Sequence, residues 1–480
     1  MAQTTPAIQN FGYLLNGEWL TDGRAVEMRA PSDHRLLATI TQPRREHLEA
    51  AIQVAASAFE VTRKLGAYER QRVLRTVAEG LTTRREEFAR TLALEAGKPL
   101  KQARVEVERA IFTFTVAAEE STRIYGEWLP LDLQASTAGR WAIVRRFPIG
   151  PIATITPFNF PLNLVAHKWA PAIAAGCTIV HKPAPQTPLC SLMLAELVQD
   201  AGWPAGGLNV LPVSVEDAEA MIVDDRLKML SFTGSAAAGW VLKKKAGKKR
   251  VALELGGNAG VIVHSDADIA YAVERCALGG FSYAGQTCIS VQRIFAQRGI
   301  YSRFLDDFVP RVRKLRLGDP MDEATDLGPM ISEAAAQRAV DWVEETVRQG
   351  AKLLCGGKRQ GAMMEPTVLT ATRSDQRVNC EEVFAPVVTV EAYDDFAEAI
   401  RRVNDSPYGL QAGVFTRDAK LLFTAFEELA VGGVIIGDVP SFRIDHMPYG
   451  GTKDSGLGRE GLRYAIEEMT ERKILAAHLP

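Results

Sequence analysis

Cysteine is scarce in this sequence: there are six among 480 residues, and no two form a Cys-x-x-Cys pair. So few cysteines cannot make a disulfide framework, and a reducing compartment is expected. The first residues lack the basic and apolar segments of a signal peptide, and Pro171 and Gly176 break the longest apolar run, 169–180. Because a membrane helix needs about 20 apolar residues, we predict no membrane segment and expect a cytoplasmic protein.

An excess of charge of either sign is also missing. Lys and Arg number 56 against 58 Asp and Glu, which gives a formal net charge of −2. This balance excludes a basic protein whose overall field attracts nucleic acid. The basic run 243–250 is best explained as a solvated helix end. No repeat of fixed period is found, and the length predicts two to four domains.

Hydrophobic periodicity divides the chain into regions. Residues 1–40 are typical of short strands and turns, and 45–120 have helical spacing. In 151–265, short apolar strands alternate with helical stretches, which favours a doubly wound parallel sheet. The strands are expected at 152–155, 178–181, 209–212, 229–232, 251–254 and 261–263. A second alternating unit follows over 266–440, and the last 15 residues form an amphipathic stretch with an apolar tail.

The segment from Gly126 to Gly150 is expected to form a projecting hairpin. Apolar stretches that begin at Trp128 and Trp141 flank the turn residues 136–139. An isolated hairpin is only marginally stable in water, so this one is expected to pack on something, such as another subunit.

Two glycine patterns have the wrong context for nucleotide binding. Residues 456–461 fit Gly-x-Gly-x-x-Gly, but only 19 residues follow them, too few for a βαβ unit. Residues 234–239 have the glycine spacing of a P-loop, but Trp240 stands where lysine is required.

Three motifs together carry chemistry. Cys288 lies in Gly-Gln-Thr-Cys-Ile-Ser, a small and accessible setting for a nucleophile. Glu254 stands at a strand end beside a Gly-Gly turn, and Asn159 lies between two prolines. A single cysteine is more often an inert buried residue. A thiol, a carboxylate and an amide, however, are the groups needed to form and hydrolyse a thioester.

In chain order, these motifs resemble the NAD(P)-dependent aldehyde dehydrogenase superfamily. The resemblance covers essentially the whole chain and includes Phe-Thr-Gly-Ser at 232–235, Glu-Leu-Gly-Gly at 254–257, Gly-Gln-Thr-Cys at 285–288, Glu-Glu-Val-Phe at 381–384 and Pro-Tyr-Gly-Gly at 448–451. It implies an α/β fold of two doubly wound parallel-sheet domains with a small β-hairpin oligomerisation element. The implied division is a dinucleotide-binding domain (1–126 and 147–254), a catalytic domain (255–465) and oligomerisation segments (127–146 and 466–480) in a homodimer or homotetramer.

The resemblance also assigns catalytic roles. Cys288 attacks the aldehyde carbon, and the Asn159 amide and the Cys288 backbone N–H donate to the resulting oxyanion. Hydride transfer to the nicotinamide leaves a thioester. Glu254 activates the water that hydrolyses it, and can also help to deprotonate Cys288.

NAD or NADP is the implied cofactor, and no metal is expected. The residues implied to surround the cofactor are Ile155, Thr156, Pro157, Phe158, Lys182, Pro185, Gly234, Ser235, Leu255, Gly256, Glu382 and Phe384. Many NAD-preferring relatives carry Glu at the position of Pro185, where its carboxylate repels a 2′-phosphate. Its absence makes NADP use plausible and leaves dual specificity open.

We hypothesise that the substrate is a small, polar or anionic aldehyde, with Arg443 and His167 as anchors. The implied substrate residues are Asn163, His167, Tyr283, Gln286, Thr287, Arg443 and Tyr449. A purely structural salt bridge from Arg443 to Asp438 or Asp445 is the competing interpretation.

Three alternative functions remain. A CoA-acylating dehydrogenase would use a thiol in place of water, but the retained Glu254 argues against it. A non-catalytic homologue on the same fold is disfavoured by the intact Cys288, Glu254 and Asn159. A thiol hydrolase is disfavoured because no histidine is linked by a motif to Cys288.

Overall fold

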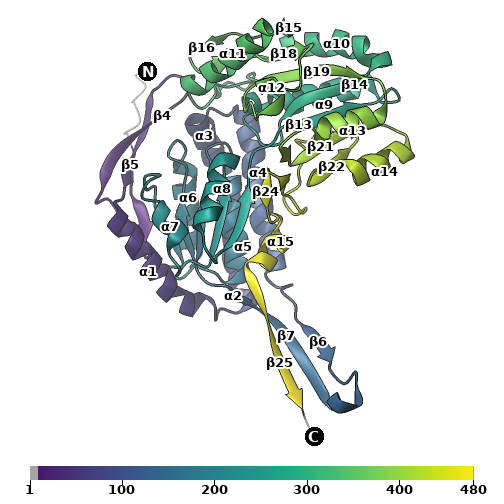
Figure 1. Ribbon diagram of the computed structural model, residues 1–480. Helices are drawn as coiled ribbons and strands as arrows, with labels where there is room; N and C mark the ends of the chain where they lie inside the picture. The colour runs from purple at the N-terminus through teal and green to yellow at the C-terminus, as the bar shows by residue number, and fades with distance from the viewer. Residues whose placement is uncertain (1–8, 479–480) are drawn as a thin grey trace.

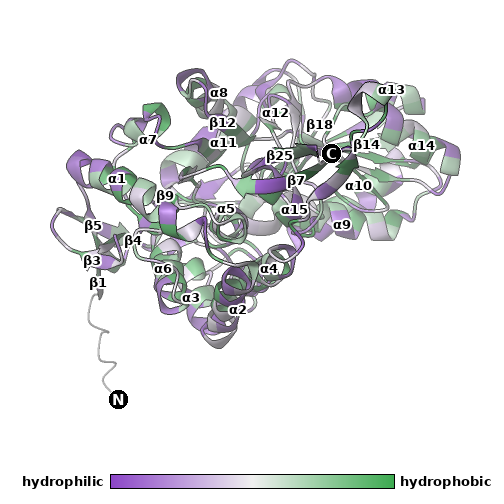
Figure 2. Cartoon of the chain, turned by 90° about the horizontal axis from the view of Figure 1, so that it is seen from below, coloured by the Kyte–Doolittle hydropathy of each residue, from purple (hydrophilic) through white to green (hydrophobic). Residues whose placement is uncertain are grey.

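The computed structural model describes residues 9–478. The predictions that concern residues 1–8 and 479–480 therefore lie outside the described residues. Two large sheets with their helices form the body, and a narrow arm projects from it (Figure 1). The helices α9 (Ile269–Phe281), α10 (Arg298–Arg313), α13 (Phe396–Asn404) and α14 (Ala419–Glu428) gather on the right of the view from below (Figure 2). No helix in residues 9–478 has the length and apolar character needed to cross a bilayer.

The amino-terminal strands and helices are confirmed. A three-stranded sheet contains β1 (Gln9–Phe11), β5 (Leu36–Gln42) and β4 (Arg24–Arg29). The predicted helical region contains α1 (Arg45–Thr62), α2 (Ala67–Thr83), α3 (Arg85–Ala96) and α4 (Leu100–Glu120). The apolar faces of α2, α3 and α4 join one buried cluster with α5 (Asn163–Ala175) and α6 (Leu189–Asp200).

The first large sheet has the order β24-β12-β11-β8-β9-β10-β2-β3. Its parallel strands are β8 (Ile152–Ile155), β9 (Ile179–Lys182), β10 (Leu208–Val210), β11 (Met229–Thr233) and β12 (Arg250–Glu254). Antiparallel strands form both edges: β2 (Tyr13–Leu15) with β3 (Glu18–Leu20), and β24 (Gly456–Leu457). The chain winds outward from β8 through β9 to β10, then returns to β11 and β12 on the other side. The glycine pattern at 456–461 therefore begins with an edge strand.

The second large sheet has the order β15-β18-β19-β14-β13-β21-β22. Its strands are β13 (Ala259–Val263), β14 (Val291–Gln297), β15 (Lys352–Cys355), β18 (Thr367–Thr370), β19 (Val387–Tyr393), β21 (Gln411–Phe415) and β22 (Gly433–Ile436). All pair in parallel except β15 with β18. A strand was expected at 261–263 as the last strand of the first sheet. The strand forms, as β13, but it lies inside the second sheet, so the predicted sheet is wrong.

The remaining elements are short or lie at the periphery. They are α7 (Glu219–Val223), α8 (Ala236–Lys245), the 3-10 helix η2 (Ser282–Gly285), α11 (Glu333–Arg348), α12 (Arg377–Cys380), α15 (Leu462–Glu468), β16 (Arg359–Gln360), β17 (Met363–Met364), β20 (Tyr408–Gly409) and β23 (Thr452–Lys453).

The arm contains three strands. β6 (Glu127–Pro130) pairs antiparallel with β7 (Arg140–Pro148), joined by a loop with the 3-10 helix η1 (Ala135–Thr137). The carboxyl-terminal stretch is the third strand, β25 (Thr470–His478), which pairs along the whole of β7. Seen from below, β25 and β7 carry hydrophobic as well as hydrophilic residues (Figure 2). The last residues were expected only as an amphipathic stretch, because their partner strand is more than 300 residues away.

Candidate active site

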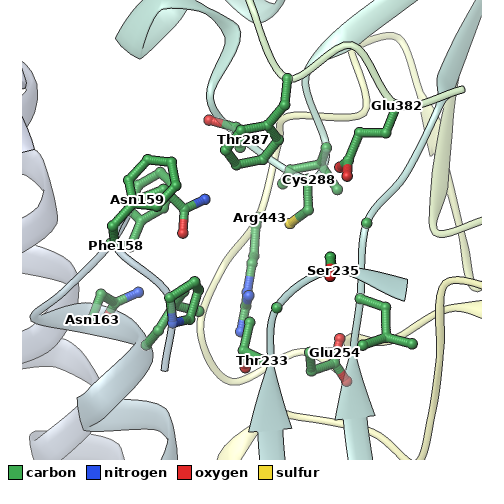
Figure 3. A pocket seen from close by; sticks show the side chains of 18 of the residues that line it. Phe158, Asn159, Asn163, Thr233, Ser235, Glu254, Thr287, Cys288, Glu382 and Arg443 are labelled. Carbon is green, nitrogen blue, oxygen red and sulfur yellow. The ribbon is translucent and has the colours of Figure 1, made fainter. Parts of the chain in front are cut away.

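The candidate active site lies where the carboxyl ends of the first sheet face the second sheet. β8 leads into the loop that carries Asn159, and β12 ends at Glu254. Cys288 approaches from the other side, in the loop before β14. β8 and β11 mark the point where the winding of the first sheet reverses, and such points bind ligands. The three side chains border one cavity of about 290 Å³ (Figure 3).

The structure brings most of the predicted site residues to this cavity. Those that line it are Pro157, Phe158, Asn159, Asn163, Gly234, Ser235, Glu254, Leu255, Gly256, Thr287, Cys288, Glu382, Phe384, Arg443 and Tyr449. Those that do not line it are Ile155, Thr156, Lys182, Pro185, His167, Tyr283 and Gln286. Within residues 9–478, no three His, Cys, Asp or Glu side chains are grouped to hold a metal ion.

Cys288 is held at the cavity by a tight backbone turn. Tyr283 and Ala284 adopt left-handed φ values of 49° and 51°, and Gly285 follows at 68°. A Cβ atom on Gly285 would lie 2.2 Å from the carbonyl oxygen of Ala385, so only glycine fits there. Burial raises the pKa of the Cys288 thiol to about 11, which keeps it protonated at neutral pH before substrate binds.

Asn159 bridges to the loop that carries Cys288. Its Nδ2 donates a hydrogen bond of 3.0 Å to the carbonyl oxygen of Gln286. An amide nitrogen carries two hydrogens, so a second N–H remains for a ligand in the cavity. In Figure 3 the amide and the Cys288 sulfur face the same space. This arrangement suits stabilisation of an oxyanion beside the sulfur.

Glu254 is buried at the opposite wall. Its Oε2 has no hydrogen-bond partner among the described residues. Burial and the nearby Glu460 raise the pKa of Glu254 well above its ordinary value, while Arg443 and Lys168 oppose this rise. A carboxylate whose pKa is raised is a stronger base, which suits a general base that takes a proton from water.

Arg443 is both a cavity residue and a paired residue. Its Nη2 donates to Glu460 at 2.8 Å, and its Nε lies 3.9 Å from an Asp445 oxygen. Nε makes no hydrogen bond in the described residues. Asp438 binds Arg275 at 2.6 Å, so the expected alternative bridge from Arg443 to Asp438 is wrong. The alternative bridge to Asp445 is present only as a long contact.

His167 supports the site from behind the cavity. Its Nε2 lies 2.7 Å from Asp445, and its side chain is only 1% exposed. Arg109 from α4 donates to the same carboxylate at 2.6 Å and lines the cavity. His167, which was expected to contact the substrate, therefore does not line the cavity. Asp445 is instead a shared partner that holds His167 and Arg109.

Tyr283 and Gln286 also face away from the cavity. The Tyr283 hydroxyl donates to the carbonyl of Ala96 at 2.8 Å, and the Gln286 side chain accepts from the Ile331 N–H at 2.8 Å. Both side chains join the Cys288 loop to neighbouring segments. Their predicted contact with substrate is not seen, because burial against these partners uses their polar groups.

One end of the cavity fits the phosphates of a dinucleotide. Gly234 and Ser235 form the turn between β11 and α8, and the Ser235 hydroxyl accepts from the Ala238 N–H at 3.3 Å. Free N–H groups at the start of a helix favour an anion. The hydroxyl of Thr233, beside this turn, is buried without a partner in the described residues.

A carboxylate and two aromatic rings complete this end. Glu382 accepts a hydrogen bond of 2.9 Å from the Gly257 N–H, and burial raises the pKa of Glu382 to about 7. Phe158 and Phe384 meet edge to face, with ring centroids 5.9 Å apart. A carboxylate can bind ribose hydroxyls, and aromatic faces can flank a nicotinamide ring. These residues fit a nicotinamide dinucleotide.

Lys182 and Pro185 lie farther along the first sheet. Lys182 ends β9, and burial lowers the pKa of its ammonium to about 8. Pro185 is exposed in the loop that follows. Ile155 ends β8, and the N–H of Thr156 donates to the Lys182 carbonyl at 3.4 Å. Because Lys182 and Pro185 do not line the cavity, only a cofactor that extends beyond the cavity would reach them with its adenosine end.

The sequence motifs missed several cavity residues. These are Arg109, Phe160, Leu164, Thr233, Ile289 and Arg338. Thr233 and Ile289 adjoin recognised motifs and could have been included. Arg109 and Arg338 lie within regular helices that carry no motif, so no local signal marks them.

Comparison with known proteins identifies the family. The family described as "Aldehyde dehydrogenase family" matches residues 19–475. A 3-sulfolactaldehyde dehydrogenase of Priestia megaterium is 44% identical over 473 residues, which cover 98% of this chain and 99% of that protein.

Two solved structures share the fold at high identity. Aldehyde dehydrogenase 21 from Physcomitrella patens, in complex with the reaction product succinate, has a TM-score of 0.97 and 46% identity, covering 98% of this chain and 99% of that one. Glyceraldehyde-3-phosphate dehydrogenase GapN from Methanocaldococcus jannaschii, complexed with NADP, has a TM-score of 0.92 and 41% identity, covering 95% and 100%. The predicted α/β fold is confirmed. The chain belongs to the aldehyde dehydrogenase family, the NAD(P)-dependent enzymes that its motifs resemble.

Proposed function

We propose that this enzyme oxidises a small aldehyde bearing an anionic group to the carboxylic acid, with NAD(P)+ as hydride acceptor. The observation that carries the proposal is that two of the three arginines lining the cavity beside Cys288 are Arg109 and Arg443, whose guanidinium groups are bridged through Asp445. Two cations at one cavity favour a substrate whose far end is an anion. Named relatives support this choice: one acts on sulfolactaldehyde and another holds succinate.

Cys288 begins the reaction in this proposal. Its thiol first loses its proton to solvent; the thiolate then attacks the aldehyde carbon, the C–S bond forms, and the carbonyl oxygen becomes an oxyanion. The free Asn159 N–H and the Cys288 backbone N–H stabilise that charge. When bound, NAD(P)+ supplies the hydride acceptor. Loss of hydride from the same carbon leaves a thioester on Cys288.

Glu254 completes the reaction. A water that gives its proton to Glu254 adds to the thioester carbon, and the C–S bond then breaks to release the carboxylic acid and the thiolate. The raised pKa of Glu254 supports this role. The presence of Glu254 favours hydrolysis over the CoA-acylating alternative, and formation of the acid without added CoA would test the choice. No activity with a broad aldehyde panel would favour the non-catalytic alternative.

The anion anchors can be tested with matched arginine variants. We expect Arg443→Met and Arg109→Met to lower kcat/KM for succinic semialdehyde about 10- to 100-fold more than for propanal. Arg275→Met is the control, because Arg275 also pairs with an aspartate but does not line the cavity. Equal losses on the two aldehydes would assign both arginines to structure alone.

Cofactor choice is proposed to include NADP. Pro185 is exposed and brings no carboxylate to the adenosine end, while Lys182 offers an ammonium. We expect turnover with NADP+, and we expect Pro185→Glu to lower kcat/KM for NADP+ at least tenfold relative to NAD+. An unchanged ratio would remove Pro185 from the specificity argument.

The arm is proposed to assemble a homodimer or homotetramer. Residues 127–146 and 466–480 form the oligomerisation element, 1–126 with 147–254 the cofactor domain, and 255–465 the catalytic domain. Exposed Trp128, Ile474 and Leu475 on the arm support an interface. A monomeric mass in light scattering would contradict it. We further propose a cytoplasmic location, because all six cysteines are unpaired.

A further inference from the structure

Tyr449 contacts the sulfur of Cys288 directly. The Tyr449 hydroxyl lies 3.1 Å from Cys288 Sγ, and either atom can donate the hydrogen bond. Tyr449 is only 3% exposed, although its ring borders the cavity. In the described residues, this hydroxyl is the hydrogen-bond partner of the thiol.

The backbone holds Tyr449 in place. Its N–H donates to the Glu460 carbonyl at 3.0 Å, and the Glu460 N–H donates back at 2.6 Å. This isolated bridge closes the loop between the two residues. This bridge fixes the backbone from which the Tyr449 hydroxyl reaches the sulfur.

A cation lies on the Tyr449 ring. The guanidinium carbon of Arg443 is 3.7 Å from the ring centroid, and Glu460 holds Arg443 there through a 2.8 Å hydrogen bond. A cation over a ring attracts its electrons, which makes the phenol O–H a stronger donor. The same glutamate thus fixes the backbone of Tyr449 and the cation above it.

The charges around the sulfur make this donor useful. Burial raises the pKa of Cys288, the Tyr449 hydrogen bond lowers it, and the nearby Glu382 and Glu254 raise it further while Arg443 lowers it. Once the thiol has lost its proton, the sulfur can only accept, so Tyr449 must be the donor. A hydrogen bond to a charged group is about twice as strong as one between neutral groups.

We propose that Tyr449 is a catalytic residue that donates its O–H to the Cys288 thiolate. It acts before the C–S bond forms, and again when that bond breaks and the electron pair returns to sulfur. The tyrosine keeps its proton throughout and transfers none. The inference rests on the proposed role of Cys288 as nucleophile, but not on the nature of the aldehyde.

Alkylation of Cys288 by iodoacetamide tests the proposal without substrate. Loss of the hydroxyl in Tyr449→Phe should raise the thiol pKa by about one unit. The thiolate fraction falls about tenfold, and part of that loss is offset because a more basic thiolate is more nucleophilic. We expect alkylation at neutral pH to slow about threefold, and kcat with propanal to fall.

An isosteric probe separates donor strength from packing. Incorporation of 3-fluorotyrosine at Tyr449 gives a more acidic phenol of nearly the same size, and should speed alkylation relative to tyrosine. Tyr393→Phe is the control, because it removes another buried hydroxyl, one that contacts His264 at 2.8 Å, and should leave the rate unchanged. If Tyr449→Phe misfolds, the alkylation rate of the fluorinated protein still tests whether the hydroxyl donates to the sulfur.

Two outcomes would overturn the proposal. Alkylation as fast or faster in Tyr449→Phe would show that the hydroxyl does not stabilise the thiolate. A rate insensitive to fluorination would show that the contact only packs the ring. Failure of the proposed nucleophile looks different: Cys288→Ser would then remain active, whatever Tyr449 does.

Discussion

The ammonium group of Lys98 donates a hydrogen bond of 2.8 Å to the main-chain carbonyl of Asn159, and it also pairs with Glu106. Both charged side chains are no more than 1% exposed. The Lys98 ammonium lies 3.7 Å from the ring centroid of Phe160, and Glu106 accepts from the Asn163 N–H at 3.1 Å. The buried Lys98–Glu106 ion pair therefore binds both ends of the loop that carries the Asn159 amide.

Lys98→Met should destabilise the protein and misplace that loop. It leaves Glu106 buried without its partner, which costs about 3–5 kcal/mol of unfolding free energy. A shift of the Asn159 amide by about 1 Å can lower kcat on the order of 100-fold. Urea unfolding and steady-state kinetics would measure the two effects.

The double variant Lys98→Met, Glu106→Gln is the control for lost charge balance. It should regain most of the stability, because no unpaired charge remains, while kcat stays low. A Lys98→Met enzyme with unchanged kcat would show that the loop holds its position without the lysine.

Replacing Glu254 with Gln should separate the two halves of the reaction. Reduced cofactor should still form in a burst during the first turnover. Steady-state kcat should fall about 100- to 10,000-fold, because no base remains to activate the hydrolytic water. The pKa of Glu254 is raised, so wild-type deacylation should accelerate as pH rises and the carboxyl loses its proton. Stopped-flow absorbance of the reduced nicotinamide would show both. Loss of the burst itself would assign Glu254 to activation of Cys288 instead.

Local sequence patterns predicted what local geometry determines. The strands β8, β9, β11 and β12 are short apolar runs, and residues at their carboxyl ends meet because the strands are parallel. The catalytic candidates Asn159 and Glu254 follow from that rule together with their motifs.

Long-range pairing was not predictable in the same way. Arg109 and Asp445 bind each other across 336 positions, and neither belongs to a motif that names its partner. The place of β13 was missed for a related reason: an apolar run does not say which sheet it joins. His167 was misplaced because a shared helix face does not distinguish the cavity from the layer behind it.

Asp445→Asn should weaken the protein at neutral pH and matter less in acid. Burial acts to raise the pKa of Asp445, but His167 and Arg109 lower it overall. A carboxyl with a lowered folded-state pKa stabilises above its unfolded pKa of about 3.9, and this is lost as pH falls toward the folded value. The variant leaves Arg109, whose side chain is a quarter exposed, without its anion, at a cost of about 1.5–3 kcal/mol near pH 7.

Denaturant melts over a pH series would test this dependence. The difference between wild type and Asp445→Asn should shrink progressively below about pH 4, because the aspartate of the unfolded chain takes up a proton there while that of the folded wild type stays ionised. A difference that is constant from neutral to acid pH would mean that shape and not charge makes Asp445 important.

Leu475→Asp on β25 should dissociate the proposed assembly. Leu475 is 60% exposed in the single chain. Burial of such a side chain contributes about 1.5–3 kcal/mol to association. A two-fold interface contains the residue from both subunits, so this contribution is made twice. A carboxylate on the same strand loses that burial and must be desolvated at the interface. Val61→Asp is the control, because Val61 is 54% exposed on α1, away from the arm. Light scattering should give a smaller mass for Leu475→Asp alone; equal masses for both variants would place the interface elsewhere.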